Sequence, residues 1–297
     1  MFLIGESAGP APIVLSCLAR HYPVTPLFEH GRWVAALPDG TRIVADDGKD
    51  KTFDETLANP TVEDLFRIPY QAGPILPVTT VNQDPGRVRI ESILVAAYGG
   101  KHVASQQVRM RFLGNPVRVH RKIAAALARV EQRLIRARAA DARLAPFLRR
   151  LSGGFAPRKI AGTDRISAHA FGVAVDLDSS QSDYWRWQRD RPLRWRNRFP
   201  QAIVDAFEAE GFIWGGRWYH YDTMHFEYRP ELLDPACRAD VTAASDSPRS
   251  QTAAAPGRES PTGASSPARK TGPVAGPPSS PASTACAACC PRTPSPT

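Results

Sequence analysis

Residues 167–178 read Ser-Ala-His-Ala-Phe-Gly-Val-Ala-Val-Asp-Leu-Asp. After Gly172 the residues alternate as in a β-strand, with Val175 on one face and Asp176 on the other. His169 lies seven positions before Asp176, and this odd spacing would place the two side chains on opposite faces of one regular strand. A turn at Gly172, which tolerates backbone conformations closed to other residues, would bring them together. The stretch therefore predicts that His169 and Asp176 can share one metal ion.

A second informative stretch lies nearer the C-terminus. Residues 214–227 read Trp-Gly-Gly-Arg-Trp-Tyr-His-Tyr-Asp-Thr-Met-His-Phe-Glu. His225 completes a set of three ligands with His169 and Asp176, and a catalytic zinc site needs three protein ligands with a fourth position left for water. Asp222, three residues before His225, is placed to act as a general base without binding the metal. The sequence thus predicts a site for one Zn²⁺ ion.

Further residues near these stretches are candidates for supporting roles. Glu227 shares a strand face with His225, so it competes with Asp222 as the base or orients a ligand; we favour Asp222. His220 is expected to line the pocket or to support a ligand. Four tryptophans could line a substrate groove, although packing in the core is more common for such residues. They are Trp185, Trp187, Trp214 and Trp218. The remaining histidines are interpreted as structural or surface residues: His21, His30, His102 and His120.

At these residues the chain resembles the VanY-type D-alanyl-D-alanine carboxypeptidases. The hallmark of this family is S-x-H-x-x-G-x-A-x-D followed by D/E-x-x-H, and both halves are present in order. The resemblance extends over residues 84–231 and implies a zinc peptidase of the Hedgehog/DD-peptidase fold, with Asp222 as the base. It also implies that Arg158 steadies the developing oxyanion and that Ser167 orients substrate or a ligand. Members of the family often carry Trp before that arginine, whereas Pro157 stands here, so Arg165 is the alternative.

The resemblance implies hydrolysis of a peptide bond in the stem peptides of peptidoglycan, with removal of the terminal D-alanine as the first expectation. An endopeptidase that cuts an L-Ala-D-Glu or cross-bridge bond is an alternative with the same chemistry. A catalytically silent, zinc-stabilised module that binds the cell wall is a second alternative. Because the wall lies outside the cytoplasm, we expect a periplasmic or envelope location, although the first 19 residues make a poor secretory signal.

The charge of the chain favours acidic partners. Its formal net charge is +9, and residues 101–160 contain fifteen Lys or Arg against Glu131 and Asp141. This stretch has no recognisable nucleic-acid module and its helix has no aromatic residue to stack bases, so no specific nucleic-acid partner is predicted. No run approaches the roughly 18 apolar residues of a membrane-spanning helix. The oligomeric state stays open.

We predict an α+β fold with a small, mostly antiparallel sheet packed against helices. Four parts are expected: 1–19, an N-terminal strand or frayed end or a remnant of a signal; 20–115, an irregular β-containing region; 116–237, the zinc peptidase domain; and 238–297, a disordered tail rich in Pro, Ala and Ser. The five cysteines are an odd number and show no disulfide pattern.

Individual elements can also be predicted. Apolar residues at helical spacing (His120, Ile123, Leu127, Val130 and Leu134) predict a long helix between Asn115 and Ala140 with Pro116 as an early helical residue. A second helix should run from Pro200 through Glu210 and end at Gly211. Strands are expected at 42–44, 87–90, 212–214 and 225–228.

Overall fold

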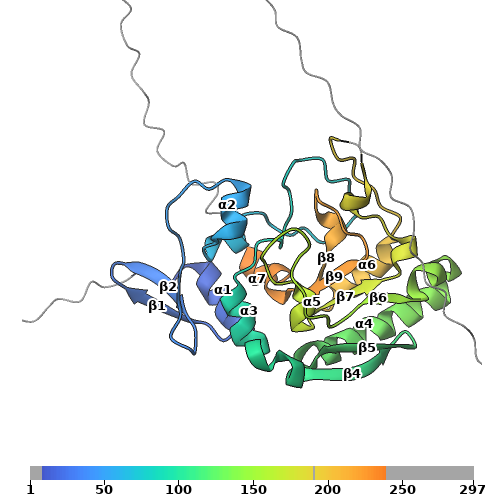
Figure 1. The fold of residues 1–297 in the computed structure, drawn as a ribbon, viewed down its shortest axis with the longest axis horizontal. Helices are drawn as coiled ribbons and strands as arrows, with labels where there is room; N and C mark the ends of the chain where they lie inside the picture. Colours follow the sequence, from blue (N-terminus) through green and yellow to red (C-terminus); the bar gives the residue numbers. More distant parts are fainter. Residues whose placement is uncertain (1–8, 190, 239–297) are drawn as a thin grey trace, which may run out of the picture. The chain divides into compact units, whose positions relative to one another are not determined.

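The computed structural model describes residues 9–189 and 191–238, which belong to one compact unit. Helices and small antiparallel sheets make up this unit, so the α+β class is confirmed (Figure 1). The predicted tail, with Cys286, Cys289 and Cys290, lies outside the described residues. The four-part division of the chain stays a prediction.

The N-terminal part combines helices with a three-stranded antiparallel sheet in the order β1-β2-β3. Its elements are α1 (Ile13–His21), β1 (Thr25–Glu29), β2 (Arg32–Ala36), β3 (Arg42–Val44), α2 (Phe53–Ala58) and α3 (Glu91–Tyr98). From Ile13 onward the expected N-terminal strand is replaced by a helix, because Val14, Leu15 and Leu18 bury one face there. Residues 1–8, where a frayed end is the alternative expectation, lie outside the described residues. The strand predicted at 87–90 is also wrong: this segment is irregular, and Arg87 and Arg89 pair with acidic side chains.

A β-hairpin precedes the longest helix. It is formed by β4 (Gln107–Phe112) and β5 (Asn115–His120), and α4 (Arg121–Ala140) follows directly. The predicted helix start near Asn115 is therefore wrong, because buried Val117 and Val119 alternate with exposed Pro116 and Arg118 and pair with β4. The helix begins after His120, whose Nδ1 accepts a hydrogen bond from the Lys122 amide at 3.1 Å. The predicted apolar stripe from Ile123 to Leu134 is buried as expected.

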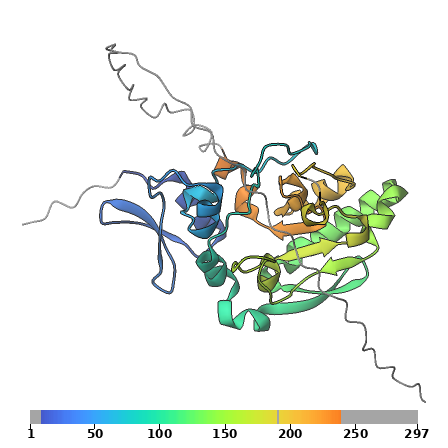
Figure 2. The ribbon, with the colours of Figure 1, turned by 45° about the horizontal axis from the view of Figure 1, so that its top comes forward.

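A four-stranded antiparallel sheet in the order β6-β7-β9-β8 forms the C-terminal part. The strands of this sheet are β6 (Leu151–Gly153), β7 (Ala174–Leu177), β8 (Phe212–Trp214) and β9 (His225–Tyr228). The same part contains the helices α5 (Ala168–Phe171) and α6 (Gln201–Glu208). The strands predicted at 212–214 and 225–228 are confirmed, and so is the second helix, after which Gly211 adopts a φ of +88°. Helix α6 packs against both β8 and α4 (Figure 2).

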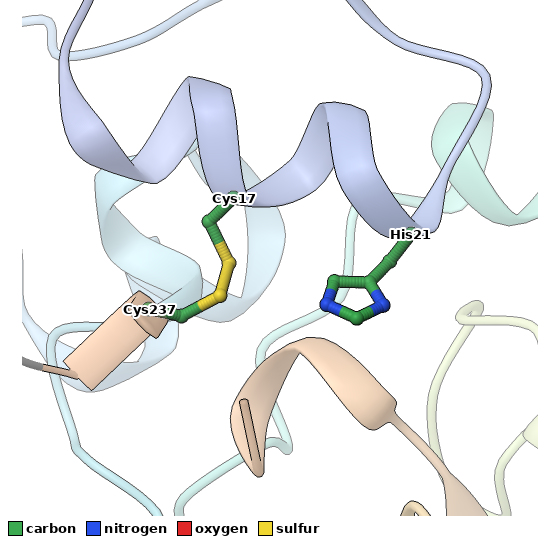
Figure 3. A group of neighbouring side chains, drawn as sticks. All are labelled: Cys17, His21 and Cys237. Carbon is green, nitrogen blue, oxygen red and sulfur yellow. A yellow bond between two sulfur atoms is a disulfide. The ribbon is translucent and has the colours of Figure 1, made fainter. Parts of the chain in front are cut away.

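The first helix lies beside the last one, α7 (Pro235–Arg238) (Figures 1 and 2). A disulfide joins Cys17 of α1 to Cys237 of α7 across 220 residues of sequence (Figure 3). Near it, His21 Nε2 lies 3.0 Å from Asp234 Oδ2. Because the two sulfur atoms are bonded to each other, this cluster offers no thiolate to a metal ion. Among the described helices, none has both the length and the apolar character needed to cross a membrane.

Candidate active site

Three side chains from different elements meet at the four-stranded sheet. His169 comes from α5, Asp176 from β7, and His225 from the neighbouring strand β9, where it is the direct partner of Asp176 in the ladder. Gly172 ends α5 with a φ of +71°, so the predicted turn that returns His169 towards Asp176 is present. The three residues are buried.

The contacting atoms of this cluster are one carboxylate oxygen and two imidazole nitrogens. Asp176 Oδ1 lies 3.1 Å from His169 Nε2 and 3.0 Å from His225 Nδ1. The two ring nitrogens lie 3.2 Å apart. These atoms are close enough to share one ion, and two imidazoles with one carboxylate are a donor set that suits zinc.

The second ring nitrogen of each imidazole, the one that points away from Asp176, also has a partner. His169 Nδ1 donates to the Gly154 carbonyl at 2.8 Å, which leaves the lone pair of Nε2 facing Asp176. His225 Nε2 lies 3.4 Å from Glu227 Oε2, which turns Nδ1 towards the same point. Outer partners of this kind fix the tautomer and the orientation of metal-binding histidines. The residues present therefore fit a zinc ion.

The electrostatics of the cluster favour a positive charge at its centre. Burial raises the pKa of Asp176, but His169 and His225 outweigh it and hold this pKa well below its ordinary value. Burial lowers the pKa of His225, whereas its contacts with Asp176 and Glu227 raise it to about 10. A bound cation would take the place of the proton that these carboxylates attract.

Asp222 lies beside the cluster with an oxygen that has no partner. Together with His169, Asp176 and His225 it lines a cavity of about 270 Å³. Its Oδ1 is buried and accepts no hydrogen bond from the described residues. Burial raises the pKa of Asp222 to about 7, with the charge of Asp176 adding to the rise and His225 and Arg158 opposing it. A carboxyl group that titrates near neutrality can both take up and release a proton.

Arg158 reaches this cavity and Arg165 does not. Arg158 lines the cavity, and its guanidinium lies 3.9 Å from Asp176 Oδ2 with 57% of the side chain exposed. Arg165 donates to the Arg87 carbonyl and lines a separate, larger cavity of about 610 Å³ that contains none of the metal-binding cluster. Ser167 lines the smaller cavity, and its Oγ accepts a hydrogen bond from the His169 amide at 3.3 Å.

Glu227 lies behind His225 and outside the cavity lining. The residue is fully buried, and Arg89 donates to both of its oxygens, one of them at 2.8 Å. Burial raises the pKa of Glu227, but Arg89 and His225 outweigh it and hold the pKa well below its ordinary value. A carboxylate with both oxygens paired and a low pKa is a poor proton acceptor, so the geometry favours Asp222 as the base.

The buried charges continue beyond Glu227 towards the N-terminal helix. Arg229 lies 3.5 Å from Glu227 and donates to Glu231 at 2.5 Å. The hydroxyl of Tyr22, next to α1, donates to Glu231 at 2.7 Å. Positive and negative side chains therefore alternate from His225 through Glu227 and Arg229 to Glu231, which contacts Tyr22.

The remaining candidates divide between the cavity and the core. Trp218 and His220 line the cavity, as do Trp185 and Trp187. Trp214 is completely buried in the core, and its indole donates to the carbonyl of Thr223 at 2.8 Å. Trp214 therefore does not line a substrate groove, although it supports the segment between Asp222 and His225.

Three charged residues of the site were missed by the sequence reasoning: Asp84, Arg87 and Arg89. Arg87 and Arg89 line the cavity, Arg89 also pairs with Glu227, and Asp84 holds both Arg87 and His220. Nothing in the local sequence of Asp84 or Arg89 identifies His220 or Glu227, which lie more than 130 residues away.

Comparison with known proteins agrees with this site. A family model described as D-alanyl-D-alanine carboxypeptidase matches residues 161–228, which include His169, Asp176, Asp222 and His225. No curated protein and no solved structure matches the chain significantly. The resemblance inferred from the two motifs is thereby confirmed: over residues 161–228 the chain is similar to the D-alanyl-D-alanine carboxypeptidases.

Proposed function

We propose that the protein is a zinc-dependent peptidase that hydrolyses the terminal D-alanyl-D-alanine bond of peptidoglycan stem peptides. One observation carries the proposal: His169, Asp176 and His225 meet in a cavity next to an unpartnered oxygen of Asp222. The family match over residues 161–228 supports a metallopeptidase in general. The substrate and the bond that is cut are part of the proposal.

Different residues of the cavity have different roles in the proposed hydrolysis. His169, Asp176 and His225 would hold one Zn²⁺, which supplies Lewis-acid polarisation to the peptide carbonyl and to water. Asp222 takes a proton from the attacking water, because its pKa lies near neutrality, and passes this proton to the nitrogen of the leaving amine. Arg158 donates hydrogen bonds to the negative charge that develops on the carbonyl oxygen.

The proposal extends to the fold and the location. The four-stranded antiparallel sheet with flanking helices is compatible with the Hedgehog/DD-peptidase fold that the resemblance implies. An envelope or periplasmic location is compatible with the disulfide between Cys17 and Cys237, because such bonds persist mainly in oxidising compartments.

Defined muropeptides ending in D-Ala-D-Ala test the activity. The zinc-loaded protein should release D-alanine, detected by mass spectrometry, and chelation should abolish the release. His225→Ala should neither bind zinc nor cleave, while a surface control, His102→Ala, should do both. Internal cleavage without release of D-alanine would support the endopeptidase alternative, and a zinc-loaded protein that binds the wall without turnover would support the silent module.

A further inference from the structure

A buried carboxylate, that of Asp84, holds two residues of the cavity wall, Arg87 and His220. Asp84 is 1% exposed, and its Oδ1 accepts a hydrogen bond from the His220 amide at 2.9 Å. Its Oδ2 lies 2.6 Å from His220 Nδ1 and accepts from an Nη of Arg87 at 3.0 Å. One acidic group therefore fixes an imidazole and a guanidinium side by side.

This wall faces the proposed reaction centre. Arg87 and His220 line the cavity that contains Asp222, whereas Asp84 does not. The guanidinium of Arg87 lies over Trp218, 5.9 Å from the ring centroid, and the Trp218 ring lies 5.7 Å from that of His225. Trp218 is thus a neighbour of both Arg87 and His225 in the wall of this cavity.

The proposed hydrolysis assigns no role to Arg87. Arg158 already supplies a guanidinium next to Asp176, and Asp222 supplies the base. Within the described chain Arg87 has one acidic partner, Asp84, although its planar group carries five donors. A partly buried guanidinium with donors to spare, in a cavity, is suited to bind a carboxylate in a fixed geometry.

We propose that Arg87, held by Asp84 and flanked by His220, binds the free carboxylate of the residue that the enzyme releases. This inference rests on the proposed function and names its substrate class: peptides whose chain ends one residue after the bond that is cut. Such a contact selects a carboxypeptidase over an endopeptidase, because an internal bond has no carboxylate at that position.

Two substrates that differ only at the chain end test the proposal. One is a stem tripeptide ending in D-Ala-D-Ala with a free carboxylate, and the other is the same peptide as a C-terminal carboxamide. The wild-type protein should favour the carboxylate roughly ten- to a hundredfold in kcat/KM, the range expected for a charge-assisted hydrogen bond. Arg87→Met should reduce this ratio to about one, mainly through KM, while the carboxamide is cleaved as before. A matched control that removes an exposed guanidinium, Arg143→Met, should keep the wild-type ratio.

Equal cleavage of both substrates by the wild type would overturn the proposal, and so would an equal loss on both in Arg87→Met. If Arg87→Met does not fold, Arg87→Lys is measured in its place and should reduce the ratio several-fold, because an ammonium cannot donate in a fork.

Calorimetric titration separates the proposal from the peptidase activity. N-acetyl-D-alanine should bind the wild-type protein at least tenfold more tightly than its amide, and Arg87→Lys should reduce this difference. If this pattern holds but no peptide is cleaved, the carboxylate site stands and the peptidase proposal fails. If peptides are cleaved but acid and amide bind equally, the peptidase proposal stands and the carboxylate site fails.

Discussion

Residues 161–228 and the chain before residue 121 contribute to the cavity in different ways. The first part supplies His169, Asp176, Asp222 and His225, which line the cavity. The second part supplies Arg87 and Arg89, which also line the cavity, and Arg89 in addition pairs with Glu227 behind His225. A motif therefore determines which chemistry is available, while partners distant in sequence determine how its side chains are oriented. Substitutions of the motif residues in the first part should remove catalysis, and those in the second should change substrate binding or stability.

The largest effect is expected inside the matched segment, from Asp222→Asn. The amide cannot accept the proton of water, so kcat should fall by about a thousandfold, within the usual range for removal of a general base. Zinc content, measured by mass spectrometry, and the free energy of unfolding should stay close to wild type. Asp164→Asn, which changes a fully exposed carboxylate in the same way, is the control and should keep full activity. Full activity of Asp222→Asn would remove the proposed base.

The disulfide should affect stability and leave the chemistry alone. Replacing Cys17 and Cys237 by Ser releases a loop of 220 residues in the unfolded chain, and should cost about 4 kcal/mol of unfolding free energy. Urea unfolding measures the loss, and kcat at low temperature should be unchanged. Reductant should destabilise the wild type and not the double variant; equal sensitivity of the two would show that another thiol is responsible.

Acid should destabilise the fold through His120. Burial lowers the pKa of this residue to about 4 from an ordinary value of 6.5. The unfolded chain therefore binds the proton first, and stability that is complete above pH 6.5 should be lost as the pH falls towards 4. The loss is limited to about 3 kcal/mol for a shift of this size. His120→Asn keeps an acceptor at the start of α4 and should reduce this pH dependence; parallel stability curves for both proteins would contradict the assignment.

The smallest effect is expected at Glu227, where the first part meets Arg89 of the second part. Glu227→Gln keeps an acceptor for Arg89 but removes the charge behind His225, so zinc affinity should fall about ten- to a hundredfold. Competition with a chromophoric chelator measures the affinity. Glu210→Gln is the control, because Glu210 is a little-exposed carboxylate that pairs with Arg129 and Arg133 and lies outside the cavity lining. An unchanged affinity in Glu227→Gln would show that Glu227 does not tune the ligand.

The metal-binding cluster could be predicted because local rules place its members. Strand periodicity gives the face of Asp176, Gly172 gives the turn that returns His169, and a three-residue spacing connects Asp222 with His225. The helix at 201–208 could be predicted in the same way, from the helical spacing of its apolar residues and from Gly211 after its end.

The other contacts depend on residues that meet only in the folded chain. Arg89 and Glu227 are 138 positions apart, and nothing in either local sequence indicates the other. The boundary between β5 and α4 was misplaced for a related reason. Pro116 is acceptable both in a first helical turn and in a strand, and pairing with β4 decided between them.

The buried charges between His225 and Glu231 limit how this chain could be recombined with a related one. A chimera that joined residues 161–238 to a foreign N-terminal half would lose Arg89 and the Tyr22 hydroxyl, and would leave Arg229 to pair with both Glu227 and Glu231. Removing one partner of a buried ion pair costs several kcal/mol. Crossovers are therefore tolerated only where both members of each pair come from the same parent, so the two halves must be inherited together.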